Sequence, residues 1–412
     1  MLLLAASIVA PPAEAKTNKV RHTAVVAPAW SGTVPSAVGQ LTDLEVRGDV
    51  VYVAGSAGIA ALSAAGEAKW TLTLPPAAFR GLHVDDGGLA FTAYTLKDVD
   101  PAKGFRAFVM GSVGDVPTYD GATIGAVTLD GALVWQVASE IQSPLSPPGL
   151  SPGSVAVMRG KDMIVVDRGD GHTLAVADLK YVGEDSKFFA GFFARGHRGQ
   201  PVWWGDRFYA SFYGTIVKTD GQGGGRETAF GPLFRPFYNV TCELVPFGDT
   251  LLGGSTGDSQ KGNTWFAIDP KFDAKMNEWS PDKQSGCGSI AVVGERAYLA
   301  SNFYVWSINA KGRVQWQSVN KKGGLYPSSA RGVRYVSGLG FRKSPTDLLV
   351  ADDKHVYVAT DNGGDVVTVL GAGDGAYVRT IDVKAPIVAL GLAGDTLVVA
   401  TDGDVRFLPA GG

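Results

Sequence analysis

The two cysteines are the first residues whose type and spacing suggest chemistry. Cys242 and Cys287 precede two similar turn residues, Asp249 and Glu295, by seven and eight positions. Each lies close to a short apolar segment, so the two occupy near-equivalent places in neighbouring strands. A disulfide can form between such positions when the Cα atoms come within about 7 Å. The sequence therefore predicts one disulfide, with two separate buried thiols as the alternative.

Acidic and histidine residues do not follow the spacing of a known metal site. The segment Asp167–Gly171 and the pair Asp352-Asp353 resemble fragments of a calcium loop but lack its full ligand spacing. Asp and Gly in this arrangement are typical of hairpin turns, which is the structure we predict for them. The histidines are scattered along the chain at His22, His83, His172, His197 and His355. We therefore predict no catalytic residues, no metal ligands and no cofactor.

Aromatic and basic residues are concentrated between Phe188 and Tyr213, and a second aromatic stretch follows nearby. Aromatic faces bind apolar groups and cations, and the adjacent basic residues attract anions. Such a patch suits a peptide strand, a glycan or an anionic ligand, whereas the alternative is that these rings belong to the core. The predicted partner-binding residues are Phe192, Phe193, Arg195, His197, Arg198 and Arg235.

A repeated unit must position these residues. A short apolar strand, a turn and a second strand rich in Val, Tyr and Ala recur, as a comparison of Leu44–Ala54 with Ile290–Ala300 shows. Most spacings between the turn residues lie from 37 to 46 positions, which is typical of a four-stranded propeller blade of about 40–50 residues. The turn residues are Asp49, Asp86, Asp162, Asp206, Asp249, Glu295, Lys354 and Asp395.

Tryptophan marks the second half of several copies. Trp70, Trp135 and Trp316 each follow a tight turn that contains Gly, in a segment that we predict to be the fourth strand. A ring at this position can fill the gap against the adjacent blade. Trp279 is the expected equivalent in copy five and Tyr377 a substitute in copy seven, whereas copies three and four show none.

These residues resemble the PQQ-type (quinoprotein-like) β-propeller repeat. Tyr52-Val53-Ala54 and the pattern A-L-x-x-x-G-x-x-x-W from Ala61 to Trp70 carry the resemblance. The family includes quinoprotein alcohol dehydrogenases and the outer-membrane assembly factor BamB. Active sites of the dehydrogenases have two adjacent cysteines, a calcium-type metal and an Asp base. Cys242 and Cys287 are not adjacent, which argues against bound PQQ and dehydrogenase activity.

The ends of the chain predict how the ring closes. Copy eight stops at Pro409, before a fourth strand of its own, and Thr23–Trp30 is strand-like with Trp30 in the fourth-strand position. We expect this N-terminal strand to complete the last blade and to remove an open edge. The predicted fold is all-β, an eight-bladed β-propeller of four-stranded antiparallel blades. Seven blades is the alternative, if Leu82–Trp135 is an irregular insertion.

Composition and the first residues bear on location. The chain has 412 residues with 37 basic and 40 acidic side chains, so it has no positive surplus to bind nucleic acid. No apolar run reaches the roughly 18 residues of a transmembrane helix. The apolar Leu2–Ala10 and Ala13-Glu14-Ala15 suggest a signal peptide at residues 1–15 and a single domain from Lys16 to Gly412. We expect export to the periplasm or medium, without a lipid anchor because no cysteine lies nearby.

The functional expectation is a non-catalytic scaffold. The resemblance to BamB-like proteins implies binding of a protein or peptide by a chain that is monomeric by itself. Two insertions, Thr95–Tyr119 and the basic Ser318–Pro345, are long loops where binding surfaces tend to occur. The alternative function is a ligand- or glycan-binding propeller enzyme that uses the central channel.

Overall fold

The computed structural model describes most of the chain as strands joined by short turns. The described residues are 16–21, 25–97, 118–139, 145–159, 162–178, 200–212, 215–224, 227–230, 240–256, 264–269, 274–279, 289–301, 304–320, 348–360 and 366–410. They form eight sheets, which we number blade 1 to blade 8 along the chain. No helix in these residues is long and apolar enough to cross a membrane. The predicted signal peptide, residues 1–15, lies outside them.

The first four blades follow one another between Leu41 and Phe230. Blade 1 contains β4 (Leu41–Arg47), β5 (Val50–Gly55), β6 (Gly58–Ser63) and β7 (Ala68–Thr73). Blade 2 contains β8 (Phe79–Asp85), β9 (Gly88–Lys97), β10 (Thr118–Val127) and β11 (Leu133–Ser139). Blade 3 contains β12 (Gly149–Leu150), β13 (Ser154–Arg159), β14 (Asp162–Asp167) and β15 (Thr173–Asp178). Blade 4 contains β16 (Val202–Trp204), β17 (Arg207–Phe212), β18 (Thr215–Asp220) and β19 (Glu227–Phe230).

The second four blades include three strands from the N-terminus. Blade 5 contains β20 (Val240–Phe247), β21 (Thr250–Thr256), β22 (Thr264–Asp269) and β23 (Ala274–Trp279). Blade 6 contains β24 (Ile290–Val293), β25 (Arg296–Ser301), β26 (Tyr304–Asn309), β27 (Val314–Val319) and β1 (Lys16–Lys19). Blade 7 contains β28 (Leu349–Ala351), β29 (His355–Thr360), β30 (Val366–Gly371), β31 (Tyr377–Asp382) and β2 (Val25–Val26). Blade 8 contains β32 (Ile387–Ala393), β33 (Thr396–Thr401), β34 (Asp404–Pro409) and β3 (Gly32–Pro35).

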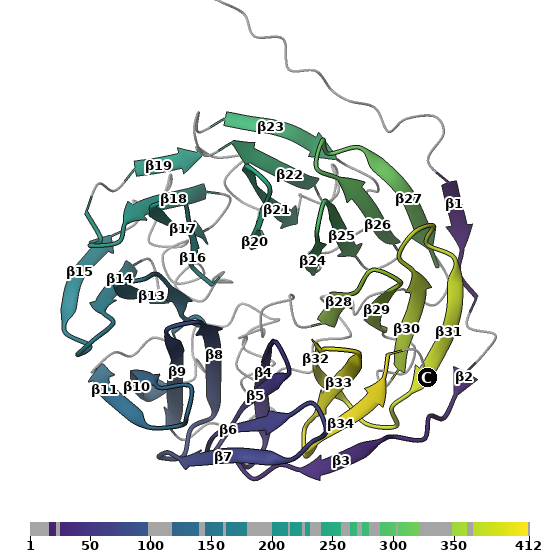
Figure 1. Cartoon of the computed structure of the whole chain (residues 1–412). Helices are drawn as coiled ribbons and strands as arrows, with labels where there is room; N and C mark the ends of the chain where they lie inside the picture. The colour runs from purple at the N-terminus through teal and green to yellow at the C-terminus, as the bar shows by residue number, and fades with distance from the viewer. Residues whose placement is uncertain are drawn as a thin grey trace, which may run out of the picture.

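The blades are arranged in a ring around a central axis (Figure 1). Consecutive strands pair antiparallel, and β4, β8, β20 and β24 lie near the axis while β7, β23, β27 and β31 lie at the rim. The prediction of an all-β propeller of four-stranded antiparallel blades is confirmed. The described parts of Leu82–Trp135 belong to the regular sheet of blade 2 and not to an insertion.

The N-terminus closes the last blade, but with a later segment than the sequence suggested. β3 pairs antiparallel with β34, from Gly32 opposite Phe407 to Pro35 opposite Asp404. The expected segment, Thr23–Trp30, was wrong: its Val25 and Val26 add instead to the edge of β31 in blade 7, and they run parallel to it. Trp30 precedes the closing strand, and Arg406 lies over its ring at 5.7 Å from the centroid. It packs against the core between blades 7 and 8.

Each boundary between neighbouring blades contains an apolar cluster, including the boundary from blade 8 back to blade 1. In that last cluster, Leu44 and Val51 of blade 1 pack with Val398 and Phe407 of blade 8. The clusters at the other seven boundaries have the same form, with side chains from two adjacent blades in each. A blade therefore has no core of its own, and its two faces are buried by its neighbours.

Tryptophans of the outer strands connect adjacent blades, as the sequence predicted. The Nε1 of Trp70 donates to the carbonyl of Leu129 in blade 2 at 2.9 Å, and that of Trp135 donates to the carbonyl of Arg168 in blade 3 at 2.7 Å. Trp316 donates to Ala372 in blade 7 at 3.0 Å. Each ring lies against a glycine of positive φ in the next turn: Gly131 (92°), Gly171 (78°) and Gly375 (69°).

The register corrects two of the expected equivalents. A β-bulge in the outer hairpin sets Trp70 opposite Ala61 and Trp316 opposite Ser307. The corresponding bulge in blade 7 places Arg379, and not Tyr377, at the position that Trp70 and Trp316 occupy in their blades. In blade 5 the bulge places Asn277 there, and Trp279 lies two residues further along the strand. Blade 3 has Ala175 at this position, which agrees with the absence of an aromatic residue in copy three.

Candidate functional site

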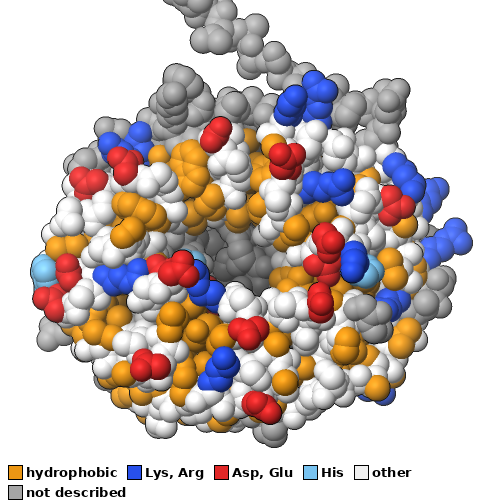
Figure 2. Space-filling model, in the orientation of Figure 1, with side chains coloured by type: hydrophobic (Ala, Val, Ile, Leu, Met, Phe, Trp, Pro, Cys, Tyr) orange, Lys and Arg blue, Asp and Glu red, His pale blue; other side chains and the backbone are white. Residues whose placement is uncertain are grey.

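A cleft of about 920 Å³ opens at the boundary of blades 2 and 3. Leu89, Val127 and Leu150 contribute apolar side chains, and Trp203 of blade 4 contributes an aromatic wall. The polar lining includes the side chains of Asp85, Asp86, Thr128, Ser151, Asp167 and Arg168. We call this the blade 2–3 cleft. Figure 2 shows one face of the ring, hollowed at its centre, with acidic and basic side chains interspersed around the hollow.

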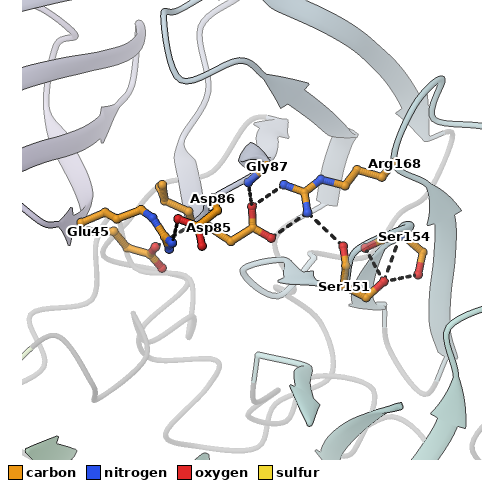
Figure 3. Close-up of polar contacts among 9 residues, drawn as sticks. Glu45, Asp85, Asp86, Gly87, Ser151, Ser154 and Arg168 are labelled. Carbon is orange, nitrogen blue, oxygen red and sulfur yellow. Dashed lines mark hydrogen bonds and ion pairs between the residues drawn. The ribbon is translucent and has the colours of Figure 1, made fainter. Parts of the chain in front are cut away.

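An ion pair between Asp85 and Arg168 joins the two sides of the cleft (Figure 3). The Nη1 of Arg168 donates to Oδ2 of Asp85 at 2.6 Å and to the carbonyl of Ser151 at 2.9 Å. The Nη2 of Arg168 donates to the other carboxylate oxygen, so the pair is bidentate. The side chain of Arg168 is 14% exposed and that of Asp85 is 32% exposed, and both therefore face the cleft while remaining partly shielded from water.

Turns at the ends of strands hold these two residues in place. Asp85 is the last residue of β8, and its Oδ1 accepts from the N–H of Gly87 at 2.8 Å. Arg168 directly follows β14, and its N–H donates to the carbonyl of Gly153 at 3.1 Å. Its carbonyl accepts from Trp135, as described above. The tryptophan contact between blades thus also fixes the backbone that carries the cleft arginine.

The electrostatics of the cleft favour the ionised pair. Burial alone would raise the pKa of Asp85, but hydrogen bonds from Arg168 and Gly87, together with the charge of Arg168, hold that pKa below its usual value. Asp86, the next residue, is 95% exposed and forms an ion pair with Arg47 of blade 1. The ion pair between Asp85 and Arg168 in the cleft is therefore maintained at neutral pH.

Polar side chains of blade 1 bind the inner edge of blade 2 beside the cleft. Thr42, Asp43 and Glu45 of β4 accept hydrogen bonds from the backbone N–H groups of Arg80, Leu82 and Val84 at 3.2, 2.8 and 2.8 Å. These three N–H groups belong to β8, the inner edge strand of blade 2, which has no further strand of its own sheet beside it. The side chains thus continue the hydrogen bonding across the blade boundary.

His83 lies in the same row of residues. Its Nδ1 is 3.1 Å from Oε1 of Glu45. Burial would lower the pKa of this imidazole, but the charge and hydrogen bond of Glu45 and the charges of Asp85 and Asp43 raise it above its usual value. The three nearby carboxylates of Glu45, Asp85 and Asp43 therefore favour the protonated form of His83.

The calcium-loop-like segment forms the hairpin turn that the sequence predicts. Asp167, Asp170 and His172 have side-chain ligand atoms within 4.8 Å of one another. The Oδ1 of Asp167 accepts from the N–H of Gly169 at 2.7 Å, and the Oδ1 of Asp170 accepts from the N–H of His172 at 2.9 Å. The two carboxylates therefore stabilise the turn between β14 and β15.

The predicted partner-binding patch lies outside the described residues. This holds for Phe192, Phe193, Arg195, His197, Arg198 and Arg235, and for Cys287. Cys242 lies in β20 of blade 5, where only the backbone is described. Most of the insertions Thr95–Tyr119 and Ser318–Pro345 are also outside. The aromatic patch, the disulfide and the insertion loops remain predictions.

The sequence reasoning missed the blade 2–3 cleft. Its polar lining comes from residues that are far apart in the sequence, since Asp85 and Arg168 are separated by 83 positions. Asp86 was identified as a turn residue of the repeat, but Asp162, the turn residue assigned to copy three, begins β14, the third strand of blade 3, so the Arg168 turn was placed one strand too early.

Comparison with known proteins shows the fold. No family model matches the sequence, and no curated protein matches it. Among solved structures, BamB from Moraxella catarrhalis is 14% identical with a TM-score of 0.57, over 92% of this chain and 96% of that one. Sqt1 from Saccharomyces cerevisiae is 10% identical with a TM-score of 0.57, over 92% and 98%. The Dos1 propeller is 10% identical with a TM-score of 0.55, over 91% and 93%. The chain therefore has a β-propeller fold.

Proposed function

We propose that this chain is a non-catalytic, exported scaffold that binds a protein partner, built from PQQ-like repeats and similar in kind to BamB-like proteins. The observation that carries the proposal is the blade 2–3 cleft, in which fixed charges lie beside an apolar wall on a rigid ring. A ring whose blades are buried against one another presents such a surface with little reorganisation, which reduces the cost of binding.

The state of the charged residues favours recognition over acid–base chemistry. A catalytic base works best when its pKa lies near the working pH. The pKa of Asp85 is instead lowered, away from neutral pH, and the guanidinium of Arg168 is already hydrogen-bonded to Asp85 and to the carbonyl of Ser151. An apolar lining with a few oriented polar groups is common to small-molecule pockets and to the cores of protein interfaces.

The repeat architecture supports the assignment to PQQ-like repeats. Blades 1 and 6 share a tyrosine–tryptophan pair, with ring centroids 6.1 Å apart for Tyr52 and Trp70 and 5.9 Å apart for Tyr298 and Trp316. Both tryptophans dock on a turn of the next blade. Export rests on the apolar segment and small residues of positions 1–15 in the sequence.

Affinity capture with cleft variants tests the proposal. The tagged chain is used to capture proteins from the envelope and secreted fractions of its source, in parallel with Asp86→Lys and Asp49→Lys variants. Asp86 lines the cleft, and Asp49 is the matched turn residue of blade 1, outside the cleft. We expect one reproducible protein partner that Asp86→Lys loses and Asp49→Lys retains.

Two results would contradict the proposal. One is a partner captured equally by both variants, or none at all. The other is stoichiometric quinone or metal in the purified sample together with turnover of an alcohol or glycan substrate. Circular dichroism of both variants before capture confirms that each is folded.

A further inference from the structure

The N-terminal strand of the chain occupies a binding site at the rim of blade 6. β1 runs parallel to β27 as a fifth strand, with Lys16 opposite Trp316 and Lys19 opposite Val319. The next residue continues this pairing, since the N–H of Val20 donates to the carbonyl of Val319 at 2.8 Å. Addition of an extended segment to a sheet edge is an established mode of peptide recognition.

Side chains select this segment. The Nζ of Lys16 forms an ion pair with Oδ2 of Asp374 at 3.0 Å, and the Nδ2 of Asn18 donates to the carbonyl of Asp374 at 2.7 Å. Val20 is 4% exposed and belongs to the cluster between blades 6 and 7 that contains Trp316. The site therefore recognises a lysine, a backbone edge and, four residues after the lysine, an apolar side chain.

The rim of blade 1 reproduces the framework of that site. Trp70 of β7 corresponds to Trp316 of β27, and each donates its indole N–H to a turn carbonyl of the next blade. Asp130 precedes the stacked Gly131, as Asp374 precedes Gly375. The carboxylate that binds Lys16 in blade 7 thus has a counterpart in blade 2, in a turn that is one residue shorter: the N–H of Thr128 bonds to the carbonyl of Ala132, whereas that of Gly371 bonds to the carbonyl of Ala376.

The two rims differ in what covers them. Within the described residues, β7 is the last strand of its sheet, and no further strand pairs with it. Trp316, beneath β1, is 1% exposed, whereas Trp70 is only half-buried. Leu129 and Leu133, on either side of the Asp130 turn, are 39% and 43% exposed. An edge strand beside exposed apolar side chains is a template for pairing.

We propose that the outer edge of β7, together with Asp130, binds an extended segment of the protein partner as a parallel fifth strand. The segment has a basic residue opposite Trp70 and, four residues later, a β-branched apolar residue beyond Thr73, as Lys16 and Val20 do on blade 6. This inference rests on the scaffold proposal, because it names the chemistry of the partner, but it concerns a surface other than the blade 2–3 cleft.

Peptide binding to the full chain tests the inference. The probe is a fluorescein-labelled peptide Lys-Thr-Asn-Lys-Val-Arg, the sequence of residues 16–21. Its anisotropy is measured during titration with the intact protein. The blade 6 edge is already filled by the tethered β1, whose effective concentration is in the millimolar range, so free peptide reports the open edge. We expect saturable binding with one site per chain.

Matched variants identify the edge. Asp130→Lys replaces an attraction with a repulsion and lowers peptide affinity about tenfold, with Asp130→Asn between it and the native chain. Asp49→Lys, which has the same charge change on the inner hairpin of blade 1, leaves the affinity unchanged. A peptide with N-methylvaline at its fifth position cannot donate the backbone hydrogen bond and binds more weakly to the unaltered protein, whatever the fate of the protein variants.

Several outcomes would overturn the inference. These are no saturable binding at millimolar protein, equal binding to the Asp130→Lys chain, or equal binding of the N-methylated peptide. Dimerisation that requires residues 16–20 would assign the edge to a second copy of this chain. If the peptide does not bind but capture of a partner still depends on Asp86, the inference fails and the scaffold proposal stands. If the peptide binds the β7 edge but no captured partner depends on Asp86, the inference stands and the proposal based on the blade 2–3 cleft fails.

Discussion

At the scale of single residues, the outer-strand tryptophans act through two contacts each. The indole N–H satisfies a turn carbonyl in the next blade, and the ring face covers a glycine that has no Cβ to oppose it. The aromatic residue was visible in the sequence, but its partner was not. The carbonyl acceptors belong to Leu129, Arg168 and Ala372, and their side chains carry no information about that bond.

Exposure determines how much each tryptophan stabilises the ring. Trp316→Ala removes a ring that is 1% exposed and leaves a cavity, so we expect a loss of about 3–5 kcal/mol in the free energy of unfolding. Trp70→Ala should cost less, because that ring is only half-buried. Urea unfolding of both variants, with Trp316→Phe as a control that removes the N–H and keeps a ring, measures the difference. Equal losses in the two alanine variants would contradict this account.

His83 gives stability a specific pH dependence. Its pKa is raised in the folded chain, mainly by Glu45 acting against burial. A raised pKa contributes stability that is complete below the unfolded value of about 6.5 and is lost as pH rises through the folded value. The native chain should therefore exceed His83→Gln in unfolding free energy by more at about pH 5.5 than at about pH 9. A difference that grows with pH would disprove the assignment.

At the scale of elements, the turns between the third and fourth strands are the contacts on which blade packing depends. Gly375 has a φ of 69°, and a Cβ there would collide with the ring of Trp316. Gly48, in the first hairpin of blade 1, has a φ of 59° with nothing within 4 Å of a Cβ. The two glycines therefore share one backbone conformation and differ in what lies beside them.

This pair separates backbone strain from packing. Gly48→Ala should cost about 1–2 kcal/mol, the price of a left-handed conformation for an L-residue. Gly375→Ala should cost distinctly more, because the buried Trp316 ring cannot move aside. Urea unfolding of the two single variants provides the comparison. Equal losses of unfolding free energy in the two variants would show that the ring of Trp316 is not in close contact with the turn at Gly375.

Strands were easier to predict than their partners. Alternation of apolar residues and the Gly-containing turns identified Leu44–Ala54 and Ile290–Ala300 as hairpins. β1 was missed because Lys16–Lys19 is polar and short, and only its pairing with β27 makes it a strand. Tyr377 and Trp279 were misplaced because each lies two residues from the strand position that Trp70 occupies in blade 1, and in blades 7 and 5 that position holds Arg379 and Asn277.

At the scale of the molecule, the apolar clusters between blades connect the ring into one unit. Because each cluster takes residues from two blades, unfolding of one blade exposes one face of each of its neighbours. The blade 2–3 cleft likewise depends on two blades, since the ion pair of Asp85 and Arg168 joins one to the other. A site of this kind is not visible in any single repeat, which is why the sequence predicted the fold and not the cleft.

Two truncations distinguish the roles of the N-terminal strands. A chain that begins at Arg21 lacks only β1 and should melt in one transition at a slightly lower temperature. A chain that begins at Ser36 also lacks β2 and β3, which exposes the edge of β34. It should melt at a much lower temperature and associate on size-exclusion chromatography. Similar melting of the two chains would show that β3 contributes little to closure.

Closure by β3 also has a consequence for biosynthesis. Ser31 and Phe407, which bond across the last blade, are separated by 376 positions, so β3 is synthesised long before its partner β34. Contacts between such distant segments fold slowly because the intervening loop loses entropy on closing. During that interval β3 has no partner strand, and chaperones have time to bind it.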